Sequence, residues 1–276
     1  RKVKEEGSVV EEIHGTTSSG LSFLVSLTYE KLSEEILVVL LDTTRLHKLE
    51  SVRRDFISNL SHELRTPVSV IRANSEALID GALEDPLAAE KFSKAILKNS
   101  EKLTFLLSDI LNLATIESGE YSLDIQHINP KNLIDEVVKN ISEQFNLVSI
   151  EVDVDDKLLV KMDSKAFEQV LVNLLENAAK YSSKENKTVI QVRSRKIGSS
   201  IRFEIEDEGI GISPDHRERV FERFFRAQNQ ETLSSPGTGL GLSIVKNLVN
   251  LMGGSVGNEP AHPKGTIFWF SLNCSK

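Results

Sequence analysis

Two long stretches of apolar residues at helical spacing constrain this fold more than any other feature. In the first, nine positions from Leu49 to Leu78 recur every 3.6 residues on average, which predicts one long amphipathic helix starting near residue 45. Gly81 interrupts this pattern. We therefore expect the helix to end shortly before Gly81.

A second helix follows after a short loop. Asp85 followed by Pro86 is typical of a helix start, because aspartate caps the first turn and proline fits its first position. From Phe92 to Leu113 the apolar stripe recurs every 3.5 residues, the spacing of supercoiled helices. Gly119 is a plausible C-terminal stop.

Two antiparallel helices with one shared apolar seam have no second layer to cover that seam. A symmetric dimer would bury both seams in a four-helix bundle. We therefore expect residues 45–119 to form a helical-hairpin dimerisation domain and the protein to be a homodimer.

Residues 120–276 alternate between strand-like and helix-like segments, which predicts a mixed α/β domain. The expected strands cover residues 122–128, 149–161, 187–196, 200–207 and 265–272. The expected helices cover residues 130–145, 164–181, 214–225 and 240–252. The chain as a whole is therefore expected to be an α+β multi-domain protein.

The first 44 residues have a β-like pattern. Leu21, Phe23 and Val25 alternate with polar or small residues, residues 15–20 look like a hairpin loop, and residues 35–41 are a candidate buried strand. A segment this short buries too little apolar surface for a core of its own, so we expect it to be part of a domain.

Composition excludes several classes of protein. The net charge of −8 argues against a nucleic-acid surface, and the longest apolar run has six residues where a membrane-spanning helix needs about 20. Cys274 is the single cysteine, so a reducing, cytoplasmic location fits best. Because Arg1 stands first, we expect a fragment of a longer protein, whose upstream part could carry a membrane anchor.

His62 is the first candidate for chemistry. It points away from the apolar seam of its helix, with Glu63 adjacent and Thr66 one turn along on the same face, before Pro67. A neutral imidazole attacks well when a carboxylate takes the proton from its other nitrogen. A solvated surface histidine is the alternative at this point.

A second group lies near the end of the helix expected over residues 164–181. Asn173, Asn177 and Lys180 share one face, so two amide oxygens and an ammonium point the same way. Amide oxygens are hard ligands that suit Mg²⁺ when it is shared with substrate phosphates. The alternative is the polar outer face of a surface helix.

Two glycine motifs and an arginine complete the candidates. Asp207 leaves a strand beside Gly209 and Gly211, where a carboxylate could accept from an exocyclic amine, although such a motif is often only a turn. Residues 237–242 carry three glycines at the start of a helix, where backbone amides could meet a phosphate, but they lack the lysine of a P-loop. Arg226 ends an aromatic cluster before a polar loop, residues 227–236, of the kind that closes over ligands.

These five groups, in this order, resemble the sensor histidine kinases of two-component signalling over roughly residues 45–273. The resemblance implies a histidine-bearing dimerisation hairpin followed by a Bergerat-type α/β sandwich that binds ATP. It implies that His62 is the phosphoacceptor, Glu63 its general base, and Thr66 the residue that places water for phospho-aspartate hydrolysis in the partner.

The same resemblance assigns the nucleotide site. Asn177 would bind Mg²⁺ with help from Asn173, Asp207 would receive the adenine amine, and Arg226 would approach the γ-phosphate of ATP. The remaining nucleotide-binding residues implied by the resemblance are Lys180, Tyr181, Gly209, Gly211, Gly237, Thr238, Gly239, Leu240 and Gly241.

The expected function is autophosphorylation of His62 from ATP, transfer of the phosphoryl group to an aspartate of a response regulator, and phosphatase activity on that regulator. Residues 1–44 look like the end of a PAS sensor domain, with a plain β-hairpin cap as the alternative. Two other functions stay open: a silent nucleotide-binding dimer scaffold, and a Bergerat-fold ATPase that hydrolyses ATP to water. No nucleic-acid partner and no membrane contact are expected for this stretch of chain.

Overall fold

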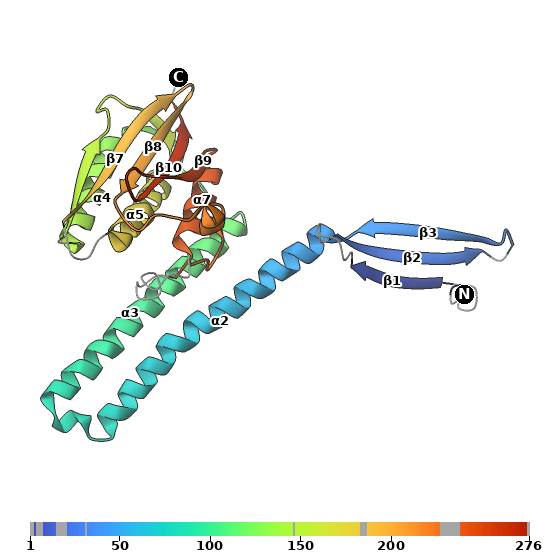
Figure 1. Ribbon diagram of the computed structural model, residues 1–276, viewed down its shortest axis with the longest axis horizontal. Helices are drawn as coiled ribbons and strands as arrows, with labels where there is room; N and C mark the ends of the chain where they lie inside the picture. Colours follow the sequence, from blue (N-terminus) through green and yellow to red (C-terminus); the bar gives the residue numbers. More distant parts are fainter. Residues whose placement is uncertain are drawn as a thin grey trace. The chain divides into compact units, whose positions relative to one another are not determined.

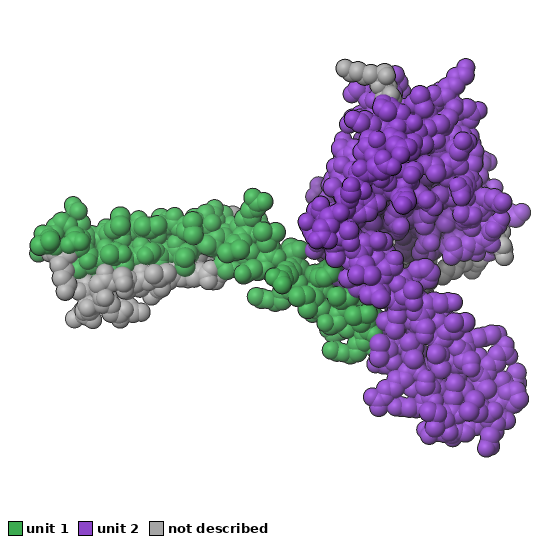
Figure 2. Space-filling view, turned by 180° about the vertical axis from the view of Figure 1, so that it is seen from behind, with its two compact units in different colours: residues 1–65 green, residues 66–276 purple. Residues whose placement is uncertain are grey.

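The computed structural model describes residues 3, 8–14, 21–30, 32–145, 147–182, 187–226 and 238–274. The chain divides into two compact units, residues 1–65 and residues 66–276, coloured green and purple in Figure 2. Each unit is described by itself below.

The first unit contains an antiparallel sheet of three strands in the order β1-β2-β3 (Figure 1). Their bounds are β1 (Ser8–His14), β2 (Ser22–Glu30) and β3 (Glu35–Asp42). Thr44, the first residue of helix α2 (Thr44–Ile79), ties the helix to the sheet, because its hydroxyl accepts from the backbone N–H of Ser22 at 3.0 Å. The loop expected over residues 15–20 lies outside the described residues.

The expectation of a buried strand over residues 35–41 is wrong. The strand β3 forms, but its six apolar residues from Ile36 to Leu41 are 45–64% exposed. The strand lies at the edge of its sheet, and no described element of this unit covers either of its faces. An apolar run alone does not say whether anything packs on it.

The predicted hairpin helices are confirmed. Helix α2 continues through Pro67 to Ile79, the short helix η1 spans Ala82–Glu84, and α3 spans Pro86–Glu117. Asp85 caps α3, since its carboxylate accepts from the backbone N–H of Leu87 at 3.0 Å. No helix among the described residues is both long and apolar enough to cross a membrane.

The second unit also contains the expected α/β domain. Its five-stranded mixed sheet has the order β5-β7-β8-β10-β9, in which only β5 and β7 run parallel. The helices α4, α5 and α7 cover one face of this sheet (Figure 1). The bounds are β5 (Val148–Asp153), β7 (Thr188–Ile197), β8 (Ser200–Asp207), β9 (Ser255–Pro260), β10 (Thr266–Asn273), α4 (Pro130–Gln144), α5 (Ser164–Tyr181) and α7 (Gly241–Leu251).

Three aromatic rings join the helices to the sheet at the centre of the core. Phe167 of α5 makes edge contacts with Phe203 of β8 and Phe270 of β10, with ring centroids 5.2 and 5.7 Å apart, and all three side chains are fully buried. This cluster fixes α5 on the sheet, and α5 carries the candidate residues Asn173, Asn177, Lys180 and Tyr181.

Side-chain caps set where the helices begin. The Asp163 carboxylate accepts from the backbone N–H of Ala166 at 2.8 Å, which starts α5, and also from the N–H of Asp124 at 2.7 Å. Asn129 caps α4 in the same way through the N–H of Lys131, 2.8 Å away. Aspartate and asparagine are among the residue types that most often cap the N-terminus of a helix.

The helix expected over residues 214–225 does not form. Two short 3₁₀ helices stand there instead, η2 (Pro214–His216) and η3 (Arg219–Phe221). Phe224 has a φ of +59°, which no α-helix allows, and its backbone N–H donates to the carbonyl of Gly239 at 2.9 Å. Tertiary contacts of the phenylalanines therefore override the helical pattern.

The expected strands also need two corrections. The strand expected over residues 149–161 is divided into β5 and a separate strand β6 (Val160–Met162). A turn separates the two strands, in which Asp155 accepts from the N–H of Lys157. Strand β6 pairs with β4 (Gln126–Ile128) rather than with the main sheet. Strand β9 is not among the expected strands, since its sequence contains glycine and proline. Gly257 in β9 lies against the Trp269 ring of β10, where a side chain would not fit.

Candidate functional site

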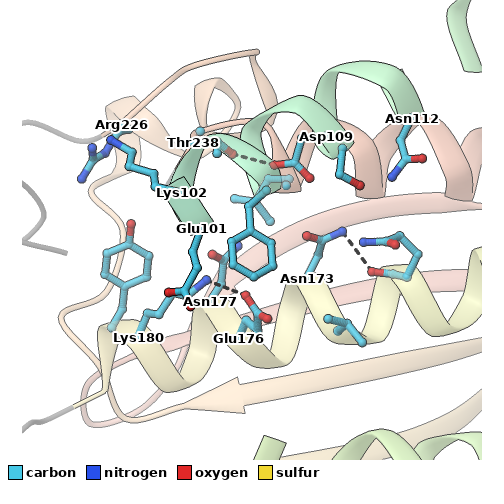
Figure 3. A pocket seen from close by; sticks show the side chains of 18 of the residues that line it. Glu101, Lys102, Asp109, Asn112, Asn173, Glu176, Asn177, Lys180, Arg226 and Thr238 are labelled. Atoms are coloured by element: carbon cyan, nitrogen blue, oxygen red, sulfur yellow. Dashed lines mark hydrogen bonds and ion pairs between the residues drawn. The ribbon is translucent and has the colours of Figure 1, made fainter. Parts of the chain in front are cut away.

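A cavity of about 590 Å³ opens in the second unit, between α3, α5 and the segments before and after the loop that precedes α7 (Figure 3). It brings together most of the candidate nucleotide residues from distant parts of the sequence. Those lining it are Asn173, Asn177, Lys180, Tyr181, Arg226, Thr238, Gly239 and Gly241.

Helix α5 supplies the polar floor of this cavity. Asn173 donates from Nδ2 to the carbonyl of Gln169 at 3.0 Å, which leaves its Oδ1 directed to the start of α7. Lys180 Nζ lies 2.5 Å from Glu176 Oε2, so the ammonium and the carboxylate are held together one turn apart. Asn177 lies between them on the same face (Figure 3).

The turn before α7 approaches α5 and the aromatic segment closely at two glycines. A Cβ on Gly241 would lie 2.9 Å from Asn173 Oδ1, and a Cβ on Gly239 would lie 2.8 Å from the Cα of Phe224. Gly239 also has a φ of +71°, which favours glycine. The glycines therefore bring the N-terminus of α7 to the cavity.

Phe225 and Arg226 reach the cavity from the other side of the same loop. The Phe225 ring lies 5.3 Å from the His216 ring, and the guanidinium of Arg219 lies 4.6 Å above it. These contacts hold Phe225, and with it the backbone of Arg226, at the rim. The loop itself, residues 227–237 with the candidate Gly237, lies outside the described residues.

Asp207, Gly209 and Gly211 do not line the cavity, but Tyr181 connects them to it. A Cβ on Gly209 would lie 2.5 Å from the Tyr181 carbonyl oxygen, and Tyr181 itself lines the cavity. Asp207 is 4% exposed, and burial raises its pKa to about 6 against the opposing hydrogen bonds from Gly209 and Thr266. The carboxyl group is thus buried next to Gly209, which adjoins the Tyr181 carbonyl at the end of α5.

The sequence did not indicate that α3 forms a wall of this cavity. Lys102, Phe105 and Asp109 of α3 line it, and Thr238 donates from its hydroxyl to Asp109 Oδ2 at 2.8 Å. Burial raises the pKa of Asp109, although the hydrogen bond from Thr238 lowers it. The one available signal was Asn99, a polar residue inside the apolar stripe of α3, which also lines the cavity.

The predicted phosphoacceptor group is on α2. His62 is exposed, Glu63 is half-buried, and Thr66 is exposed one turn further along the same helix. None of the three lines the cavity.

Leu240 differs from its neighbours in the turn before α7. Its side chain is fully buried, and its backbone N–H donates to Thr238 Oγ1 at 3.2 Å.

The cavity offers oxygen ligands of the kind that Mg²⁺ accepts. The described residues contain no group of three or more His, Cys, Asp or Glu side chains that could hold a metal by itself. Mg²⁺ commonly keeps several waters and takes few protein oxygens together with substrate phosphates. The amide oxygens of Asn173 and Asn177 suit that arrangement. Thiolate or imidazole ligands would not suit it, because Mg²⁺ prefers oxygen ligands.

Two family models match the chain, one over the hairpin and one over most of the α/β domain. Residues 52–119 match the His Kinase A (phospho-acceptor) domain, HisKA. Residues 162–276 match HATPase_c, the histidine kinase-, DNA gyrase B- and HSP90-like ATPases. The candidate histidine and the cavity-lining part of α5 fall within these two ranges.

Similar proteins agree with the family models. Sensor histidine kinase WalK of Bacillus subtilis (strain 168) is 33% identical over 240 residues, which cover 86% of this chain and 39% of WalK. The structure of the histidine kinase AdeS of Acinetobacter baumannii matches 78% of this chain and 98% of that chain at 25% identity, with a TM-score of 0.63. The structure of the histidine kinase ThkA in complex with the response regulator protein TrrA has the same fold, at 22% identity and a TM-score of 0.64, over 99% of this chain and 81% of that chain.

The chain spans 39–61% of the length of the first curated relatives that it matches. Within that span it has both characteristic parts, a phospho-acceptor region on a helical hairpin and an ATP-binding domain. The chain therefore belongs to the sensor histidine kinases of two-component signalling.

Proposed function

We propose that this chain is the kinase part of a sensor protein, which transfers the γ-phosphoryl group of ATP to His62 and from there to an aspartate of a response regulator. The observation that carries the proposal is the cavity that Asn177, Lys180 and Arg226 line together with Gly241, the first residue of α7. Amide oxygens, two cations and helix N–H groups together suit a nucleotide polyphosphate better than any other common ligand.

The chemistry at His62 follows from its place on the helix. One ring nitrogen attacks the γ-phosphorus, the bond from that phosphorus to the bridging oxygen breaks, and ADP leaves. The carboxylate of Glu63, the next residue, takes the proton from the other ring nitrogen. Because His62 is exposed, the nucleotide and later the regulator have access to it.

The nucleotide would contact residues that line the cavity and, beyond Tyr181, the group around Asp207 that lies beside it. Lys180 and Arg226 would contact the phosphates, Tyr181 the nucleoside, and the Asp207 carboxylate the adenine amine. Asn177, with help from Asn173, would hold Mg²⁺, which when bound neutralises phosphate charge. Gly209 and Gly211 would line the adenine pocket, while Gly237, Gly239 and Gly241 would act as hinges of the loop over residues 227–236.

The chain would form a homodimer, and each chain would consist of three parts. We assign residues 1–44 to a partial PAS-like sensor region, 45–119 to the dimerisation and phosphotransfer domain, and 120–276 to the ATP-binding domain. Apolar residues of the hairpin stripes, such as Leu49 and Val68, are more than half exposed in the single chain. A second hairpin packed against these stripes in a four-helix bundle would bury them.

The response regulator partner is supported by the ThkA–TrrA complex, whose histidine kinase shares this fold. Thr66, one turn after His62, would orient a water molecule toward the phospho-aspartate of a bound regulator. This would give the chain phosphatase activity in addition to kinase activity.

Incubation of the purified chain with γ-labelled ATP and Mg²⁺ tests the proposal. A protein-bound label that is labile in acid and stable in alkali is the expected result, since phosphohistidine has this stability. Release of free phosphate with no label retained would indicate a plain ATPase instead. Nucleotide binding with neither label nor free phosphate would indicate a silent scaffold.

A further inference from the structure

The Thr238 hydroxyl lies at the point where α3 and the start of α7 meet beside the cavity (Figure 3). It donates its proton to Asp109 Oδ2 at 2.8 Å and accepts from the backbone N–H of Leu240 at 3.2 Å. Asp109 belongs to the hairpin and Thr238 to the ATP-binding domain, 129 residues later. One hydroxyl group thus connects the two domains at the nucleotide site.

A hydroxyl group has one proton to donate. Phosphate oxygens are acceptors only, and so is an ionised carboxylate. Thr238 can therefore donate to Asp109 or to a phosphate oxygen, but not to both at once. A nucleotide whose phosphate oxygen accepts from the Thr238 hydroxyl has to displace the Asp109 carboxylate from it.

Charge acts in the same direction as this competition. Asp109 lines the cavity, where a partly buried carboxylate repels phosphate more strongly than an exposed one does. Lys180 is close enough to lower the pKa of Asp109, while Glu176 raises it. The ammonium that would serve the phosphates is therefore shared with two carboxylates in the absence of nucleotide.

A second polar contact holds the same surfaces together. Glu117 at the end of α3 forms an ion pair with Arg223, three residues before Arg226. The two contacts, Asp109 to Thr238 and Glu117 to Arg223, connect α3 to the segments before and after residues 227–237. Docking of α3 against the ATP-binding domain is thus held by one contact in the lining of the cavity and one outside it.

We propose that Asp109 competes with the phosphates of ATP for the Thr238 hydroxyl, so that docking of α3 and binding of ATP weaken each other. The inference rests on the proposed function and adds a form of regulation to it. Coupling between two binding events is reciprocal. A change in the hairpin that withdraws Asp109 therefore raises the affinity for ATP by a certain factor, and bound ATP shifts the equilibrium toward undocking of α3 by the same factor. Asp109 is then the residue through which the hairpin controls the nucleotide site.

The test is a double-mutant cycle on the affinity of the full chain for a non-hydrolysable ATP analogue with Mg²⁺, measured by calorimetry. The variants are Asp109→Ala, Thr238→Ala and the double variant. We expect Asp109→Ala to tighten binding roughly fivefold, the low end of ordinary allosteric coupling. In the Thr238→Ala background the same change should have less than half of that effect, because no hydroxyl is left to compete for.

Two further variants keep the test decisive. Asp109→Asn removes the charge but keeps an acceptor oxygen for Thr238, so it should tighten binding less than Asp109→Ala does, and it maintains the size of the side chain if the alanine variant is unstable. Glu90→Ala is the matched control, because it removes an exposed carboxylate that pairs with Lys94 on the same helix. Its affinity should equal that of the unchanged chain.

Three results would overturn the proposal while leaving the proposed function intact. They are an unchanged affinity in Asp109→Ala, equal tightening with and without the Thr238 hydroxyl, and equal tightening in the Glu90→Ala control. Failure of the unchanged chain and every variant to bind the analogue would overturn the proposed function itself.

Discussion

The Asp207 carboxylate accepts a hydrogen bond through Oδ1 from the backbone N–H of Gly209, 2.8 Å away. The same oxygen accepts from the N–H of Thr266 in β10 at 3.3 Å. Both backbone donors use Oδ1, so Oδ2 is left to accept from a ligand. The loop after β8 and the first residue of β10 thus hold one oxygen of this carboxylate through two backbone donors.

Nucleotide affinity should depend on pH through Asp207. The pKa of about 6 means that this carboxyl group is largely ionised at pH 7.5 and largely protonated at pH 5. Since the adenine amine needs an acceptor, we expect affinity for the ATP analogue to fall up to about tenfold per pH unit below pH 6. In Asp207→Asn, calorimetry between pH 5 and 7.5 should show weak binding that lacks this fall, and the same fall in that variant would refute the assignment.

The same group should affect stability in the opposite direction. The pKa of Asp207 is raised from 3.8 to about 6 by folding, so the folded chain binds the proton more tightly than the unfolded chain. The stabilisation this gives is fully present below pH 3.8 and is lost as the pH rises through 6, at most about 3 kcal/mol in total. Urea unfolding of the unchanged chain and of Asp207→Asn, compared at pH 5 and 7.5, should show this loss only in the unchanged chain.

Asn177 should be needed for the reaction but not for the fold. Removing its amide oxygen in Asn177→Ala takes away the proposed Mg²⁺ ligand, and we expect labelling of the protein by γ-labelled ATP to fall roughly 10- to 100-fold, with a higher Mg²⁺ requirement. Asn140→Ala, an exposed asparagine on α4, is the control and should stay within twofold of the unchanged chain. Full labelling of Asn177→Ala at low Mg²⁺ would exclude this role.

The aromatic cluster should dominate the stability of the ATP-binding domain. Phe203 is fully buried between Phe167 and Phe270, so Phe203→Ala leaves a cavity and should cost about 3–5 kcal/mol of unfolding free energy. Phe105→Ala is the matched control, since that ring is 69% exposed, and should change the unfolding free energy by less than about 0.5 kcal/mol. Denaturant unfolding of both variants measures the difference; a similar cost for both would contradict this account of the core.

Local signals in the sequence predicted helix ends well. Asp85 with Pro86 predicts a helix start, and the structure confirms it, because the Asp85 carboxylate accepts from the backbone N–H of Leu87. These signals are local because a cap and the turn it stabilises are within a few residues of each other. The order of the motifs then identified the family.

Contacts between distant residues could not be predicted in the same way. Phe221, Phe224 and Phe225 have helical spacing in sequence. In the structure, Phe224 donates its backbone N–H to Gly239 and the Phe225 ring packs against His216 instead. Asp109 looks like one more polar residue on α3 until Thr238 is placed beside it. Both cases depend on which segments the sheet and α5 bring together, and a single sequence does not show that.

The identity of the phosphoacceptor tests the central claim most directly. The chain should be incubated with γ-labelled ATP and Mg²⁺ as three proteins: unchanged, His62→Gln, and His47→Gln, which changes another histidine on the same helix. The account predicts an acid-labile, alkali-stable label on the unchanged chain and on His47→Gln, and none on His62→Gln. An undiminished label of this kind on His62→Gln would contradict it.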